Sequence, residues 1–105
     1  MELWGFVTGQ NENGYYKKYA NGLLECWGRV EGTFNHETNY TYNLPISYIG
    51  NASVNLTPNK LTDIANNETI HGDIVDGNIL TIRHHRLGGA TYIGAISYFI
   101  IGFWK

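Results

Sequence analysis

Gly14-Tyr15-Tyr16-Lys17-Lys18-Tyr19-Ala20-Asn21-Gly22-Leu23-Leu24-Glu25-Cys26-Trp27-Gly28-Arg29-Val30 is the stretch that decides how this chain folds. Asn21-Gly22 separates two strand-like runs, and both residue types accept the positive φ of a tight type I′ turn. A two-residue turn gives two favourable pairs on one side, Lys18 with Glu25 and Tyr16 with Trp27. The other side of the second run is small or apolar throughout: Leu24, Cys26, Gly28, Val30, Gly32 and Phe34. This alternation predicts a β-hairpin with one face on a core.

The segment from Asn13 to Gly28 resembles the opening of the C-terminal tip domain of bacteriophage tail fibres. That opening has a Gly-Tyr-x-(Arg/Lys) strand, an Asn/Asp-Gly turn and a hydrophobic strand ending near Trp-Gly. The closing stretch Tyr98–Trp104 is similar to the aromatic and β-branched strand that ends these domains. The resemblance implies a homotrimeric β-structure at the distal end of a virion's tail fibre, which binds the bacterial surface. Residues 1–13 would then connect this tip to the fibre shaft.

Length and composition limit the alternatives. A chain of 105 residues predicts one domain, residues 1–105. The net charge of −2 argues against nucleic-acid binding, which needs a basic stripe. The sequence contains no run of eighteen apolar residues, so no membrane span is predicted. The opening Met1–Trp4 lacks the features of a signal peptide. The many Tyr, Trp and Gly residues favour a β-rich fold with tight corners.

Further strands follow from the same period of two. The pattern predicts a short strand over Leu3–Val7, a polar loop over Thr8–Asn13, and strands over Tyr40–Tyr48, Ala52–Leu56 and Thr91–Trp104. Pro45 limits its strand to an edge or an interrupted ladder, and Gly50-Asn51 indicates a turn. Asp76-Gly77 is a second hairpin signal. Its register stays open, because a turn there puts Leu80 opposite Asp73 and a shift by one residue is no cleaner. Together these segments predict an all-β fold, a small antiparallel β-sandwich.

The last strand is apolar on both faces, and this predicts association. A chain of this size lacks material for a third layer, so a neighbouring subunit is expected to cover one of the faces. No helical heptads occur, so a homotrimer would be held by sheet faces. The residues expected at the trimer interface are Tyr16, Trp27, Tyr98, Ile100 and Trp104.

Catalytic and metal sites find little support in the sequence. Cys26 lies on the core-facing side of its strand, where a thiol is usually inert packing. His84 and His85 are adjacent, so in a strand they point to opposite faces and do not chelate one metal. The acids contain no pair whose spacing identifies a glycosidase. We therefore expect no enzyme activity, no cofactor and no metal site within one chain. A metal held on a trimer axis by three copies of one histidine stays open at this point.

Polar and aromatic loop residues favour glycan binding. Sugars are held by ring stacking and by hydrogen bonds from Asn, Asp, Arg and His side chains in shallow, wet sites. Two stretches offer that mixture, residues 36–40 and the basic stretch 83–89, which is expected to turn the chain before the last strand. The residues predicted to contact the receptor are His36, Asn39, Tyr40, Arg83, His84, His85 and Arg86.

The expected partners are two other copies of the chain and a bacterial cell-surface polysaccharide or outer-membrane structure. Three identical sites on one rigid tip would gain avidity. Two alternatives stay open at this point: a structural cap that terminates the fibre without touching the receptor, and a fragment of a glycan-processing enzyme.

Overall fold

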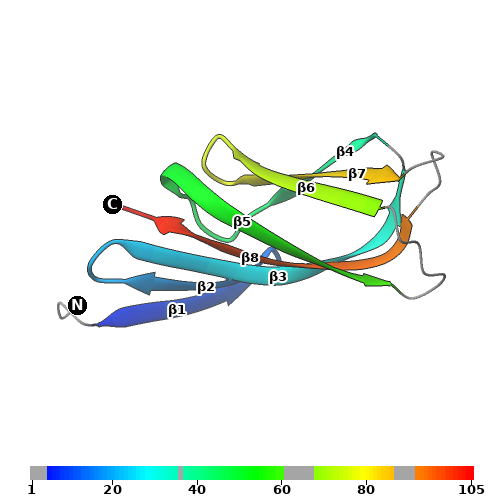
Figure 1. Cartoon of the computed structure of the whole chain (residues 1–105). Helices are drawn as coiled ribbons and strands as arrows, with labels where there is room; N and C mark the ends of the chain where they lie inside the picture. Colours follow the sequence, from blue (N-terminus) through cyan, green and yellow to red (C-terminus); the bar gives the residue numbers. More distant parts are fainter. Residues whose placement is uncertain (1–4, 36, 61–67, 87–91) are drawn as a thin grey trace.

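The computed structural model describes residues 5–35, 37–60, 68–86 and 92–105 and shows an all-β sandwich of two antiparallel sheets (Figure 1). The predicted fold class is therefore confirmed. The strands are β1 (Phe6–Asn11), β2 (Gly14–Tyr19), β3 (Leu23–Phe34), β4 (Asn39–Asn43), β5 (Ile49–Lys60), β6 (Glu68–Val75), β7 (Ile79–Arg86) and β8 (Tyr92–Phe103). The described residues contain no helix that could cross a membrane.

The larger sheet has the strand order β1-β2-β3-β8-β5. β3 and β8 pair along their whole length, from Leu23 opposite Phe103 to Phe34 opposite Tyr92. The smaller sheet, in the order β4-β7-β6, covers one face of the larger one (Figure 1). The molecule is elongated, with extents of 51 × 23 × 21 Å.

The turn between β2 and β3 differs from the predicted one by a single residue. Ala20, Asn21 and Gly22 form a three-residue loop in which Gly22 N donates to Tyr19 O (3.1 Å) and only Gly22 takes a positive φ, 107°. This is the three-residue hairpin loop in which a glycine follows an ordinary turn. The register slips accordingly and pairs Tyr15 with Trp27, Tyr16 with Cys26 and Lys17 with Glu25.

The slip moves every side chain of β2 to the opposite face from the predicted one. Tyr16, not Lys17, now stands beside Cys26 and packs against the core. The predicted pairing of Tyr16 with Trp27 was therefore wrong. A two-residue turn would have placed Lys17 opposite Cys26 on the apolar side. The observed register instead places Lys18 opposite Leu24, where its ammonium lies 4.1 Å from the Trp104 ring centroid.

The core lies between the two sheets. It contains Leu24, Cys26 and Phe34 from β3, Ile96, Tyr98 and Ile100 from β8, Leu80 and Ile82 from β7, and the buried Leu44 and Tyr48. Tyr48 donates its hydroxyl hydrogen to Ile100 O (2.8 Å), which satisfies a polar group inside an apolar layer.

The open register of the second hairpin resolves to a three-residue loop as well. Asp76 and Gly77 take positive φ values of 55° and 79°, and Ile74 pairs with Leu80. This register puts Ile70, Gly72 and Ile74 on the inner face of the small sheet, and Asp73 is opposed by Thr81 of β7 and not by Leu80.

Three other boundaries were predicted incorrectly. Phe6–Asn11 is strand β1, paired with β2, where a loop was expected from residue 8. β4 ends at Asn43, two residues before Pro45, and the chain then crosses the β6–β7 turn, with Leu44 N donating to Asn78 O and Tyr48 N to Gly77 O, each at 2.8 Å. Gly50 and Asn51 form an irregularity inside β5, not a turn between strands.

Candidate functional site

Exposed polar side chains gather on the outer face of the small sheet. Asn39, Arg83 and His71 occupy neighbouring positions on β4, β7 and β6, and all three are exposed. Arg83 Nη1 donates to Asn39 Oδ1 at 3.2 Å. We call these residues, together with Glu37 and His85, the polar cluster.

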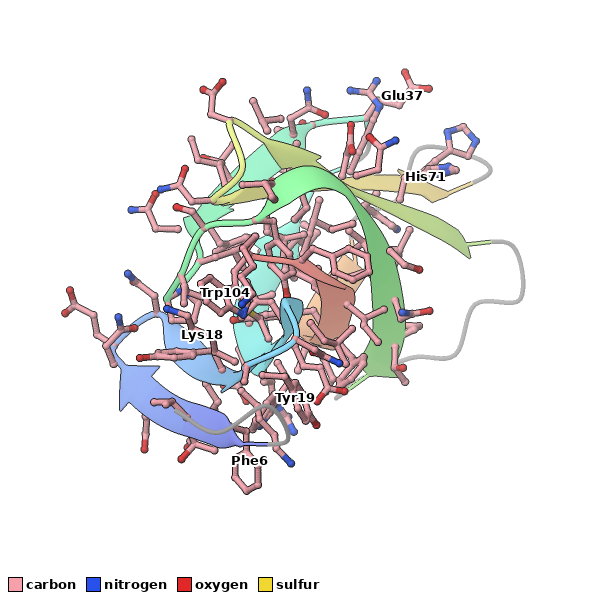
Figure 2. All side chains as sticks on the ribbon, turned by 90° about the vertical axis from the view of Figure 1, so that its left-hand side faces the viewer. Phe6, Lys18, Tyr19, Glu37, His71 and Trp104 are labelled. Atoms are coloured by element: carbon pink, nitrogen blue, oxygen red, sulfur yellow. The ribbon has the colours of Figure 1, made fainter. Side chains whose placement is uncertain are left out.

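The second half of the polar cluster lies at the end of β7. His85 Nδ1 lies 3.3 Å from Glu37 Oε1, and the two side chains are 45% and 53% exposed. Glu37 has a positive φ of 54°, and its backbone N–H donates to His84 O at 2.8 Å, which fixes the acid beside β7. Figure 2 shows Glu37 and His71 on one side of the molecule and Phe6 on the opposite side.

The chemistry of the polar cluster is that of hydrogen bonding and charge. It offers a guanidinium, two imidazoles, an amide and a carboxylate, all of which reach solvent. Such groups can donate to and accept from the hydroxyls of a sugar, and the guanidinium can bind a carboxylate or phosphate. Among the described residues, no group of three or more His, Cys, Asp or Glu side chains is placed to hold a metal ion.

Three of the residues predicted to contact the receptor are thus brought together: Asn39, Arg83 and His85. Tyr40 is not, because its ring turns inward onto Phe34, edge to face with the centroids 5.2 Å apart, and its hydroxyl accepts from Asn35 N (2.8 Å). His36 and the side chain of Arg86 lie outside the described residues.

His84 requires a correction. It is fully buried, because β7 continues through residues 83–86 where a turn was expected, and alternate residues of a strand point to opposite faces. Arg83 and His85 take the outer face, so His84 faces the core beside Ile70, its partner on β6. It has no surface to offer a receptor.

Sequence reasoning did not select Glu37 and His71. His71 joins the polar cluster only through the β6–β7 register, which sets it opposite Arg83. Counting outward from a three-residue loop at 76–78 would have placed His71 opposite Arg83.

The outer face of the large sheet is rich in aromatic side chains. Tyr15 and Trp27 stack with centroids 5.9 Å apart and planes 5° apart, and Phe99 and Phe103 on β8 are 40% and 51% exposed. Phe6 is exposed at the β1 edge, where the Lys17 ammonium lies 4.1 Å from its ring centroid. We call Phe6, Tyr15, Trp27, Phe99 and Phe103 the aromatic face.

Of the residues predicted at a trimer interface, only Trp27 lies on the aromatic face. Tyr98 and Ile100 are 5% and 0% exposed because the small sheet covers them, so that part of the prediction was wrong. The prediction chose the wrong face of β8, because Phe99, Ile101 and Phe103 are the residues that face outward. Tyr16 packs against the core. Trp104 is half-buried, with Nε1 donating to Tyr19 O at 2.7 Å and the Lys18 ammonium 4.1 Å from its ring (Figure 2).

Cys26 is fully buried in the core. Burial raises the pKa of its thiol to about 11, although a hydrogen bond with Tyr48 acts in the opposite direction. A thiol that stays protonated at neutral pH is neither a nucleophile nor a metal ligand.

The comparisons with known proteins concern the fold. No protein-family model and no curated protein matches the chain. Among solved structures, it is similar to an N-truncated R1-type pyocin tail fibre, with a TM-score of 0.69, 18% identity, and 94% of this chain and 86% of that chain covered. It is also similar to a Pseudomonas aeruginosa R1 pyocin fibre, at the same TM-score and identity, of which it spans 28%. For an N-truncated R2-type pyocin tail fibre the TM-score is 0.69 at 12% identity, with 93% and 37% covered.

Proposed function

We propose that this chain is the receptor-binding tip of a tail fibre of a phage or a phage-tail-like particle. It would form a homotrimer and attach the particle to a bacterial surface glycan or outer-membrane structure. The observation that carries this proposal is the fold likeness, which extends over 94% of the chain to a tail fibre. The resemblance of the sequence from Asn13 to Gly28 to tail-fibre tips is an independent support.

The aromatic face supports assembly with other copies. Large rings on the outer side of a sheet are costly to leave in water, and burying them is worth about 25 cal/mol per Å². The neighbouring charges Lys17, Arg29 and Glu31 border these rings, as polar groups border an interface.

The positions of the chain ends and of the polar cluster along the long axis support receptor contact at the polar cluster. Gly5, the loop between β2 and β3, and Trp104 meet at one end, where Ala20 N donates to Gly5 O and Trp104 N to Gly22 O, each at 2.9 Å. β7 ends toward the other end of the long axis (Figure 1). A shaft joined ahead of Gly5 would therefore leave the polar cluster pointing away from it.

The mode of action would be binding without catalysis. Each polar cluster is shallow and exposed, so one site alone binds weakly. Three copies on one rigid trimer raise the overall avidity without any new contact. Short, paired strands hold the cluster's side chains, so little backbone movement is needed on binding.

Adsorption of the purified, fluorescently labelled chain to a panel of bacterial isolates tests the proposal. We expect at least one isolate to bind it, and Asn39→Ala/Arg83→Ala to reduce adsorption about tenfold or more. The matched control, Asn51→Ala/Lys105→Ala, also removes one amide and one cation and should adsorb normally. Normal adsorption of the first variant would favour the cap that terminates a fibre, and release of sugar from the cells would favour an enzyme.

A further inference from the structure

A cleft of about 660 Å³ lies between the β1–β2 turn and β4, away from the polar cluster's Arg83–His85 strand end. Its volume falls within the range of about 300–1,000 Å³ typical of small-molecule sites. β4 joins the two places, because Asn39 belongs to the polar cluster while Thr41 and Asn43 line the cleft. The lining residues are Gln10, Asn11, Glu12, Asn13, Gly14, Tyr15, Gly28, Arg29, Val30, Thr41, Tyr42, Asn43 and Tyr98.

The inner wall of the cleft is fixed by Tyr98. Its hydroxyl donates to Asn13 O at 3.0 Å, which ties the β1–β2 turn to the core strand β8. A Cβ on Gly14 or on Gly28 would lie 2.5 Å from the Tyr98 hydroxyl oxygen, so both glycines are needed for this contact. Within the turn, Asn13 N donates to Asn11 Oδ1 at 2.8 Å. The wall is therefore formed before any ligand arrives, and this lowers the entropic cost of binding.

The lining is about equally polar and apolar and nearly free of net charge. Its uncharged polar side chains are three amides, one aliphatic hydroxyl and two phenols: Asn11, Asn13, Asn43, Thr41, Tyr42 and Tyr98. Gln10 and Tyr15 also border the cleft, but their side chains lie on the outer face of the large sheet, where Tyr15 stacks on Trp27. Glu12 and Arg29 carry opposite charges, and Arg29 is already paired with Glu31, which lies outside the lining, at 3.1 Å. Burial raises the pKa of Tyr42 and of Tyr98, so both phenols stay protonated at physiological pH. The Tyr98 hydroxyl hydrogen is already donated to Asn13 O.

This composition selects among ligand classes. Amides bind hydroxyl groups through paired donors and acceptors, and phenol rings give flat apolar surfaces against which a sugar ring packs. An acidic glycan or a nucleotide would need surplus positive charge, which this lining lacks. A lipid chain or an apolar peptide would need a mostly apolar wall.

From these features we infer that the cleft is a second binding site, for a short, uncharged saccharide. The inference rests on the proposed function, since it specifies the receptor chemistry of a surface-binding tip. The polar cluster would contact one part of a surface glycan, and the cleft would select a neutral sugar unit of it.

NMR titration of the ¹⁵N-labelled chain tests the inference directly. The probes are glucose, mannose, galactose, N-acetylglucosamine and their common disaccharides at millimolar concentration. We expect at least one of them to shift the side-chain amide signals of Asn13 and Asn43. Asn13→Ala/Asn43→Ala should weaken that binding tenfold or more, and Tyr42→Phe, which removes a single hydroxyl, should weaken it about threefold or more. Asn35→Ala/Asn51→Ala removes two exposed amides elsewhere and should leave it unchanged.

The outcomes separate this inference from the proposed function. If no neutral sugar shifts these signals, or if glucuronic acid or sialic acid alone does so, the inference is overturned. Shifts that surround Arg83 and spare Asn13 and Asn43 would overturn it too. In each case adsorption to cells is measured separately, so a chain that adsorbs normally without cleft binding retains the proposed function and loses only this site.

Discussion

Tyr15 and Trp27 lie ring against ring on the outer surface of the large sheet, 5.9 Å between centroids and 5° between planes. They are directly opposed on β2 and β3. With the exposed Phe99 directly opposite Trp27 on β8, the stack gives the proposed trimer a definite contact surface.

Replacing Trp27 and Phe99 with glutamate should dissociate the assembly. Six like charges in one trimer would repel each other and lose their hydration on burial. Light scattering should give a trimer of the 11.9 kDa chain for the unaltered protein and a monomer for Trp27→Glu/Phe99→Glu. Val75→Glu, which adds an acid at an exposed apolar position of the small sheet, should remain trimeric. A monomeric unaltered protein at micromolar concentration would contradict the trimer.

Gly28→Ala should destabilise the fold by about 1–3 kcal/mol, the usual cost of overpacking. The added Cβ would stand 2.5 Å from the Tyr98 hydroxyl oxygen and 2.7 Å from its ring carbon Cζ. Urea denaturation measures the loss, and Thr33→Ala, at an exposed position of the same strand, should change stability by less than about 0.5 kcal/mol. In a Tyr98→Ala background most of the cost should vanish. An equal cost with and without Tyr98 would show that this contact is not its cause.

The Cys26 thiol should resist alkylation in the folded protein. Burial raises its pKa from 9.0 to about 11, so ionisation alone slows the reaction with iodoacetamide about a hundredfold at pH 8, and exclusion of the reagent slows it further. Mass spectrometry after timed quenching gives the rate, and the same chain in urea is the control. Equal rates in the two conditions would place the thiol in solvent.

Alkaline pH should lower stability through the same thiol. The folded state holds its proton more tightly than the unfolded state, so this contribution is complete below pH 9 and is lost as the pH rises from 9 to about 11. The free energy of unfolding should fall by about 1 kcal/mol between pH 8 and pH 10. In Cys26→Ala, which has no thiol to titrate, the fall should be smaller by that amount. An identical fall in both proteins would exclude Cys26 as the source.

The sequence predicted the sandwich and most strands, because β3 alternates clearly with a period of two and β8 is a long apolar run rich in aromatic and β-branched residues. It did not predict which face of β8 is covered by the chain itself. Ile100 and Ile101 are equally apolar, and the choice depends on where the distant small sheet packs. Loop length was the other weak point: Asn21-Gly22 and Asp76-Gly77 each match a two-residue turn, yet each belongs to a three-residue loop.

The residues of the site were predicted only in part. Arg83 and Asn39 were identified from their polarity, and their contact follows from β4–β7 pairing. His84 was misplaced because residues 83–86 were expected to turn, whereas strand parity buries it. The cleft brings the β1–β2 turn to β4 and Tyr98, segments that no local pattern connects.

The meeting of Gly5, Gly22 and Trp104 at one end gives the molecule a fixed polarity. A fibre segment joined at either terminus would attach at that same end of the molecule, so the opposite end would not carry the connection. Under the proposed function, substitutions around Glu37 and His85 would change which receptor is bound while the contacts at the other end stay as they are. Host range could then change without loss of attachment to the particle.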